Sequence, residues 1–568
     1  MKIFHVRDET MTTHNRKHNL GARPTSINMI VLIAAALTTG SAYAQANVAI
    51  DLSKAVNILT DASIGVPAVM FNADAFNPAG VPYLHAAGVT AMRYPGNHGV
   101  ADLYHWSTRS ATPYKSATAA YFAPESTFPN FAQVAEKLGT AVIVVNYGSN
   151  IDGNRGGEPA EAAAWVAYAN GDPSDARVIG KDSTGDDWQT VGYWATLRAA
   201  VPLGIDDGLN FLRINHPKPF GYKLWLVGDQ IYDNGYLGEK FSGNPDLHGP
   251  APTNPKDVAK LKKDPKLSPE AFGENLKLFA AAMKTVDPSI QIGAGFATPH
   301  EAQQSRPQAG GNEYAAAGMG DATGSEWNRA VLKSACASID FVSLDWATGN
   351  PLPPDYKTLD ESNLFPDTRY QVNGMITSLL GQYKDSCPSG HVPRIALSSA
   401  QIQSWLQVPH PVARALWLAD TYSILVESGF LSIDLPEAYG DSMLSSDLKK
   451  FGMNYFGLQM LHIVAHSPGD ALIEATSSSP TLSVHATRRR DGIVGIMLVN
   501  TDPKSPATVK ISLKNGGVGT TGKRFDYGAV QSSQNLPVAA SPLTVTGNDF
   551  TVNVPPYTVT DLLLPLTK

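Results

Sequence analysis

Cysteine is scarce in this sequence, which contains two in 568 residues, Cys336 and Cys387. There is no C-x-x-C pair and no Cys/His cluster at zinc spacing, which excludes a structural zinc site or a thioredoxin-type redox motif. We therefore expect no metal and no cofactor. Each cysteine lies shortly before an apolar, strand-like run. If these two strands are neighbours, the cysteines lie at the same end and can form a disulfide; the alternative is two buried free thiols.

An excess of positive charge is also lacking. The formal net charge is −7, and loss of residues 1–44, which hold five Lys/Arg and two Asp/Glu, makes it −10. An acidic chain is repelled by nucleic acid and by anionic membrane surfaces, so we expect neither as a partner. The sequence leaves the oligomeric state open.

A hydrophobic run long enough to anchor the chain in a bilayer is missing too. The apolar run at 29–37 is too short for a stable span. Basic residues precede it, and "SAYAQA" follows with a small-residue cleavage site after Ala44. This pattern predicts a signal peptide over 1–44 and a secreted or periplasmic protein, the alternative being an uncleaved anchor.

Beyond the signal peptide, short apolar runs alternate with segments of helical spacing. The helical segments include 159–169, 268–286 and 411–428. Eight such runs over this length are typical of an α/β fold of the (β/α)8 TIM-barrel type, which we place at 61–469. The eight predicted strands lie at 64–72, 89–97, 141–149, 222–229, 289–297, 340–347, 394–401 and 430–438.

The pattern changes at about residue 470. Helical spacing stops, and short alternating strands follow, separated by Gly, Ser, Asn and Pro. This predicts an appended all-β sandwich domain at 470–568. The strand at 46–52 precedes the barrel, and we expect the segment 45–60 to join that sandwich.

Four stretches at predicted strand ends carry a recognisable pattern. They are "MRYPGNHGVADLYHW" at 92–106, "VIVVNYGS" with "EPAEAAAWVAYANG" at 142–171, "PFGYKLWLVGDQIYDNGY" at 219–236 and "RIALSSAQIQSW" at 394–405. In order along nearly the whole mature chain, they resemble one enzyme family, the α-L-arabinofuranosidases of glycoside hydrolase family 51 in clan A.

The resemblance breaks at the catalytic residues. The acid/base glutamate of the family falls on Gln230, and its nucleophilic glutamate falls on Ser399; the stretch 394–407 contains no Asp or Glu. Retaining glycosidases use two carboxyl groups about 5 Å apart. An amide has no proton to give, and a neutral serine without a neighbouring base is a weak nucleophile.

Because the chemistry of a TIM barrel lies at the carboxyl ends of its strands, candidate residues come from those ends. Relocated carboxylates, if the chain is active, would be Asp229, Asp345 and Glu437. The candidates for substrate binding are Arg93, Asn97, Asn146, Asp229, Gln230, Trp346, Ser399 and Trp405.

Three functional hypotheses remain open. The first is a catalytically impaired, carbohydrate-binding protein that resembles arabinofuranosidases. The second is an active glycoside hydrolase on plant or microbial polysaccharide that uses relocated carboxylates. The third is a scaffold or interaction protein without a sugar ligand, because a fold alone does not determine a function.

Overall fold

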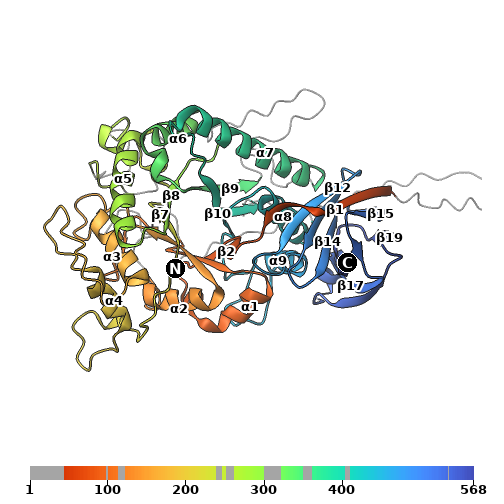
Figure 1. The fold of residues 1–568 in the computed structure, drawn as a ribbon, viewed down its shortest axis with the longest axis horizontal. Helices are drawn as coiled ribbons and strands as arrows, with labels where there is room; N and C mark the ends of the chain where they lie inside the picture. The colour runs from red at the N-terminus through yellow and green to blue at the C-terminus, as the bar shows by residue number, and fades with distance from the viewer. Residues whose placement is uncertain are drawn as a thin grey trace, which may run out of the picture. The chain divides into compact units, whose positions relative to one another are not determined.

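Eight parallel strands close into a barrel, with helices around them (Figure 1). The computed structural model describes residues 44–96, 100–112, 122–237, 246–250, 261–299, 322–348, 361–402, 410–534 and 536–567. The order around the barrel is β10-β11-β2-β3-β6-β7-β8-β9. These strands are β2 (Ile64–Pro67), β3 (Ala91–Tyr94), β6 (Thr140–Val145), β7 (Leu224–Val227), β8 (Gln291–Gly295), β9 (Phe341–Thr348), β10 (Arg394–Ile402) and β11 (Ile433–Asp434).

Each of the eight predicted runs overlaps one barrel strand, which confirms the predicted TIM-barrel fold. Nearly every strand residue is buried, as expected for parallel strands covered by helices. The described helices are α1 (Val81–Ala86), α2 (Phe128–Leu138), α3 (Pro159–Asn170), α4 (Val191–Ala199), α5 (Pro269–Val286), α6 (Ala322–Ala335), α7 (Glu361–Ser386), α8 (Ala413–Glu427), α9 (Met453–Val464) and the short α10 (Ala529–Ser533).

Helix α5 illustrates how the sequence defines these helices. The Ser268 side chain accepts the backbone N–H of Ala271, and Pro269 occupies the first turn, where it sacrifices no hydrogen bond. One stripe of the helix is apolar and packs against the core. Its buried side chains include Phe272, Leu276, Phe279 and Met283. None of the helices in the described ranges is both long and apolar enough to cross a membrane.

A ten-stranded mixed sheet forms the second part of the fold. The first described strand, β1 (Ala44–Ile58), lies in it between β12 and β15, and pairs in parallel with β15 and antiparallel with β12. The remaining strands are β12 (Ala471–Ser477), β13 (Leu482–Arg488), β14 (Ile493–Asn500), β15 (Ala507–Lys514), β16 (Gly517–Val518), β17 (Thr521–Gly528), β18 (Ala540–Thr544), β19 (Asp549–Val554) and β20 (Thr558–Thr567).

The sheet curls so that its two ends share one core. Strands from the middle and from both ends of the order contribute buried apolar side chains to a single cluster. Leu543 of β18 and Phe550 of β19, which lie at opposite ends of the strand order, both belong to it. The sheet thereby buries its own apolar face, as the two layers of a sandwich do.

The two cysteines form a disulfide, with their Cα atoms 5.5 Å apart. Cys336 follows α6 and lies five residues before β9, and Cys387 follows α7 and lies seven residues before β10. Strands β9 and β10 are neighbours in the barrel, so the bond joins the segments that lead into the amino-terminal ends of adjacent strands.

Candidate functional site

A buried arginine organises the carboxyl ends of four barrel strands. Arg93, in β3, is 2% exposed. Its Nε lies 3.2 Å from Asp434 Oδ2, and its Nη1 lies 3.5 Å from Asp229 Oδ2. Its Nη2 donates to the backbone carbonyl of Ser398 at 3.2 Å. The guanidinium therefore ties together the strand ends that carry the residues expected to form the site.

The charges around Arg93 nearly balance. Burial, and to a lesser extent the charge of Asp229, raise the pKa of Asp434 to about 7, although Arg93 opposes both effects. Asp434 thus takes up a proton near neutral pH. The predicted role of Asp229 as a relocated catalytic carboxylate does not fit this position, because the side chain is 2% exposed and paired with Arg93.

A second buried carboxylate, Asp102, positions the segment that leads to Gln230. Asp102 accepts backbone N–H groups from Tyr147 and Gly148 at 3.0 and 3.2 Å, and from Asp229 at 3.0 Å. Burial raises its pKa to about 7. The residue thereby joins the ends of β6 and β7 and fixes the turn in which Gln230 follows Asp229.

Gln230 and Ser399, the two positions to which the sequence resemblance assigns acid and nucleophile, lie near each other, with Asp345 between them. Gln230 Nε2 donates to Asp345 Oδ2 at 2.8 Å. The β9–β10 register places Asp345 and Ser399 directly opposite each other as Cα partners. Since paired residues on neighbouring strands point to the same face, Gln230, Asp345 and Ser399 form one polar row at this end of the barrel. This row has a carboxylate in the middle, at Asp345, and an amide and a hydroxyl at its two ends.

A cavity of about 310 Å³ opens beside this row, above β2, β3, β10 and β11. Ser399 lines it, is 2% exposed, and its Oγ has no hydrogen-bond partner among the described residues. Gln230 and Asp345 are not among its lining residues. These are Pro67, Val69, Phe71, Asn72, Ala75, Arg93, Gly96, Ser398, Ser399, Gln401, Pro436, Glu437, Ala438 and Tyr439.

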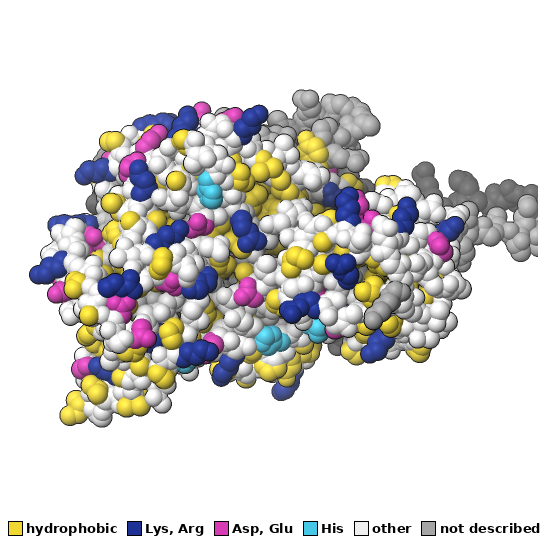
Figure 2. All heavy atoms as spheres, viewed as in Figure 1, with side chains coloured by type: hydrophobic (Ala, Val, Ile, Leu, Met, Phe, Trp, Pro, Cys, Tyr) yellow, Lys and Arg dark blue, Asp and Glu magenta, His cyan; other side chains and the backbone are white. Residues whose placement is uncertain are grey.

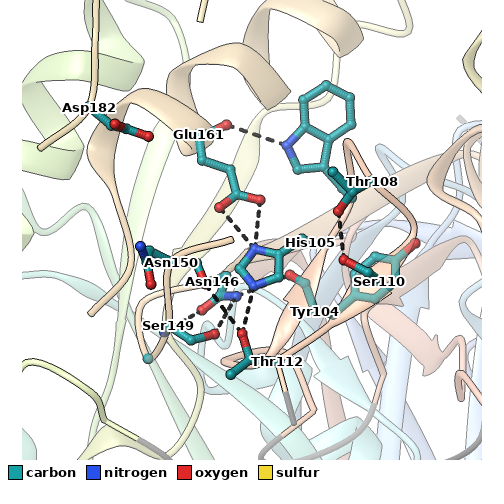
Figure 3. Close-up of polar contacts among 12 residues, drawn as sticks. Tyr104, His105, Thr108, Ser110, Thr112, Asn146, Ser149, Asn150, Glu161 and Asp182 are labelled. Atoms are coloured by element: carbon teal, nitrogen blue, oxygen red, sulfur yellow. Dashed lines mark hydrogen bonds and ion pairs between the residues drawn. The ribbon is translucent and has the colours of Figure 1, made fainter. Parts of the chain in front are cut away.

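Asn146 lies at the end of β6, as predicted, but its amide is engaged within the protein. Its Nδ2 donates to the Tyr104 carbonyl and to Ser149 Oγ, each at 3.2 Å, and its Oδ1 accepts the Ser149 N–H (Figure 3). We infer that Asn146 shapes the loop after β6. A direct contact with a ligand would require part of this network to open.

A buried histidine next to Asn146 was not among the predicted site residues. His105, at the end of the short strand β4 (Tyr104–His105), is fully buried, and its Nδ1 lies 3.1 Å from both oxygens of Glu161. Its Nε2 lies 3.0 Å from Thr112 Oγ1, which donates to the Asn150 carbonyl (Figure 3). Through these contacts His105 joins helix α3 to the loops after β3 and β6. A histidine between two aromatic residues, Tyr104 and Trp106, was the available signal.

Trp346, one of the predicted substrate-binding residues, does not lie where it could contact a sugar. It is 1% exposed, its indole N–H donates to Gln371 of α7 at 3.2 Å, and its ring lies 6.1 Å from that of Trp417 in α8. Side chains alternate along a strand, so the residue next to the inward-facing Asp345 must face the helices. Two other predicted binding residues, Asn97 and Trp405, lie outside the described residues.

The part of the chain that the structure describes contains no group of three His, Cys, Asp or Glu residues that could hold a metal ion. On the face drawn in Figure 2, acidic and basic side chains are interspersed. Neither sign of charge gathers there into one large patch.

The fold matches solved glycoside hydrolases at low sequence identity. The chain resembles an α-L-arabinofuranosidase from Thermotoga maritima solved with arabinose, at 16% identity and a TM-score of 0.62, covering 92% of this chain and 100% of the other. A family 51 arabinofuranosidase from Xanthomonas axonopodis pv. citri matches at 15% identity and a TM-score of 0.62, covering 92% of this chain and 99% of the other. A family 44 xyloglucanase from Paenibacillus polymyxa matches at 13% identity and a TM-score of 0.55, covering 92% of this chain and 100% of the other. No family model matches the chain, and no curated protein matches it significantly.

Proposed function

We propose that this chain binds carbohydrate at the carboxyl end of its barrel and does not perform the two-carboxylate hydrolysis of the enzymes that it resembles. The observation that carries the proposal is the polar row. Gln230 and Ser399 occupy the positions that the resemblance assigns to acid and nucleophile, and Gln230 donates to Asp345. Amide and hydroxyl groups both donate and accept hydrogen bonds, which suits recognition of sugar hydroxyls.

The missing chemistry supports binding over turnover. General acid–base catalysis contributes roughly 10²–10⁴-fold, and a covalent step adds more. A glutamine at 230 cannot protonate a leaving oxygen. Ser399 has no hydrogen-bonded base among the described residues, since its Oγ is unpartnered.

We also propose that the mature protein is secreted or periplasmic, with residues 1–44 removed as a signal peptide. The Cys336–Cys387 disulfide supports an oxidising compartment. In this proposal residues 45–60 and 470–568 form the sandwich domain, and 61–469 form the barrel domain.

The test compares binding with turnover in purified mature protein. Binding is measured as the rise in melting temperature with arabinose, xylose, glucose and their oligomers, because a ligand that binds the native state alone must stabilise it. Turnover is measured with aryl arabinofuranoside, xyloside, glucoside and glucuronide. The double variant Gln230→Glu with Ser399→Glu is assayed beside the natural sequence.

We expect sugar-dependent stabilisation, no turnover by the natural protein, and turnover gained by the double variant. Turnover by the natural protein that is lost in Asp345→Asn or Glu437→Gln would instead establish an active hydrolase with relocated carboxylates. Neither stabilisation nor turnover with any sugar would favour the scaffold hypothesis.

A further inference from the structure

The cavity beside the polar row is small and has a defined composition. Its volume of about 310 Å³ is at the lower limit for small-molecule sites, which are roughly 300–1,000 Å³. A cavity of that size accommodates one sugar ring. Phe71 lines it and is 57% exposed, so an aromatic ring stands at its opening. Such a ring can cover the apolar face of a sugar.

Glu437 is the one carboxylate among the described lining residues, and its orientation is fixed. The Ser442 hydroxyl donates to Glu437 Oε1. The carboxylate also packs over Gly440, whose φ is +151°. A Cβ at that glycine would lie 2.6 Å from Oε2 and 3.0 Å from Oε1. The loop after β11 therefore holds a half-buried carboxylate in the cavity wall, where a residue larger than glycine at 440 would displace it.

The other polar groups of the cavity leave its net charge negative. The charge of Arg93 is offset by its contacts with Asp229 and Asp434. Ser399 Oγ is neutral, buried and unpartnered, so it offers one hydrogen bond to a ligand. No described lining residue other than Arg93 is a cation. A carboxylate on the ligand would face Glu437 without a free positive charge to balance it.

We propose that this cavity binds a single uncharged sugar ring, with Glu437 accepting hydrogen bonds from ring hydroxyls, Ser399 bonding a further hydroxyl, and uronic acids excluded by charge. This inference rests on the proposed carbohydrate binding and adds the ligand class and the residues that select it. It places recognition at the ends of β10, β11, β2 and β3, beside the family's catalytic positions and centred on a carboxylate that the resemblance does not assign.

The experiment is calorimetric titration of the mature protein with four methyl glycosides: α-L-arabinofuranoside, β-D-xyloside, β-D-glucoside and β-D-glucuronide. The same titrations are made with Glu437→Gln, Ser399→Ala and the control Asp441→Asn. Asp441 is an exposed carboxylate in the same loop that does not line the cavity. Its substitution removes the same charge from the chain. Thermal unfolding of each variant reports whether it folds. If Glu437→Gln does not fold, Ser399→Ala still tests the proposal.

We expect at least one uncharged glycoside to bind, and the glucuronide to bind about tenfold or more weakly than the best of them. Glu437→Gln should weaken the uncharged ligand about tenfold, because hydrogen bonds to a charged group are the stronger kind, and should reduce the discrimination against glucuronide. Ser399→Ala should weaken it several-fold, and Asp441→Asn should leave the affinity unchanged.

The outcomes separate this inference from the proposed function. Glucuronide binding as tight as the best uncharged sugar, or affinity unaffected by Glu437→Gln and Ser399→Ala, overturns the inference while carbohydrate binding stands. Failure of every glycoside in calorimetry, together with no stabilisation by any sugar or oligomer, overturns both.

Discussion

A histidine between the barrel and the ten-stranded sheet makes the stability of this protein sensitive to alkali. His485 of β13 is 5% exposed, and its two ring nitrogens lie 3.0 Å from Asp420 and 2.9 Å from Glu427, both in α8. Arg369 of α7 also pairs with Asp420, and Asp561 of β20 interacts electrostatically with His485. Because both nitrogens face carboxylates, the ring is held as an imidazolium. Substitution His485→Gln removes this charge.

The magnitude follows from the proton that His485 holds. Burial lowers the pKa of His485, but Glu427 and Asp420 together raise it from 6.5 to about 10. Since the pKa is higher in the folded state, the stabilisation is complete below pH 6.5 and is lost as the pH rises to about 10. Within that window the free energy of unfolding should fall by about 1.4 kcal/mol per pH unit, or about 3 kcal/mol between pH 7 and pH 9.

The assay is urea unfolding at half-unit steps from pH 7 to pH 9, for the natural protein and for His485→Gln. The variant should be less stable at pH 7, and its stability should fall with pH by about 1.4 kcal/mol per unit less steeply. His216→Gln is the matched control, because His216 pairs with Glu136 near the surface, where such pairs contribute roughly 0–1 kcal/mol. Equal slopes for the natural protein and His485→Gln would refute the reasoning.

Three further substitutions test the packing described above, each by urea unfolding. Gly65→Ala places a Cβ 2.0 Å from Asp434 Oδ1, so it should displace that carboxylate and cost about 1–3 kcal/mol; an unchanged stability would contradict the Arg93 arrangement. Gly381 lies inside α7, where an added Cβ would meet no described atom within 4 Å beyond the helix's own neighbouring backbone, so Gly381→Ala should instead stabilise by about 0.4–1 kcal/mol. Replacing Cys336 and Cys387 by serine opens a loop of sequence separation 51 and should lower the free energy of unfolding by about 4 kcal/mol. Little change in that free energy would contradict a stabilising role for the disulfide.

The barrel was predictable because burial and strand pairing nearly coincide in a parallel sheet. They do not coincide at the ends of the apolar runs. The run at 430–438 contains the two-residue strand β11, Ile433–Asp434. Leu431, outside the strand, is 3% exposed and already donates its N–H to the Ile395 carbonyl of β10, whereas Pro436, beyond the strand, has no N–H to donate. Hydrophobicity reports which residues leave water, while the extent of a strand depends on backbone hydrogen bonds that it does not encode.

The site was predictable as a set of strand ends and unpredictable as a set of contacts. The strand-end rule selected Arg93, Asp345 and Glu437. It did not select Asp434, although a carboxylate inside an apolar strand requires a buried partner and was a usable signal. It also did not select Asp102, whose three backbone partners come from the ends of two other strands. Such pairings depend on the three-dimensional register of the barrel, which one sequence does not specify.

The proposed binding function agrees with the distribution of the described carboxylates at the carboxyl ends of the barrel strands. Retaining hydrolysis requires two carboxyl groups about 5 Å apart that both reach the sugar. Asp229 and Asp434 are occupied by Arg93, and Glu437 is the one carboxylate among the described residues that line the cavity. A single carboxylate can accept hydrogen bonds from sugar hydroxyls, but it cannot both protonate a leaving oxygen and attack the anomeric carbon. A hydrolytic mechanism would have to recruit Asp345, which accepts the Gln230 amide and does not line the cavity, whereas binding uses the groups where they already lie.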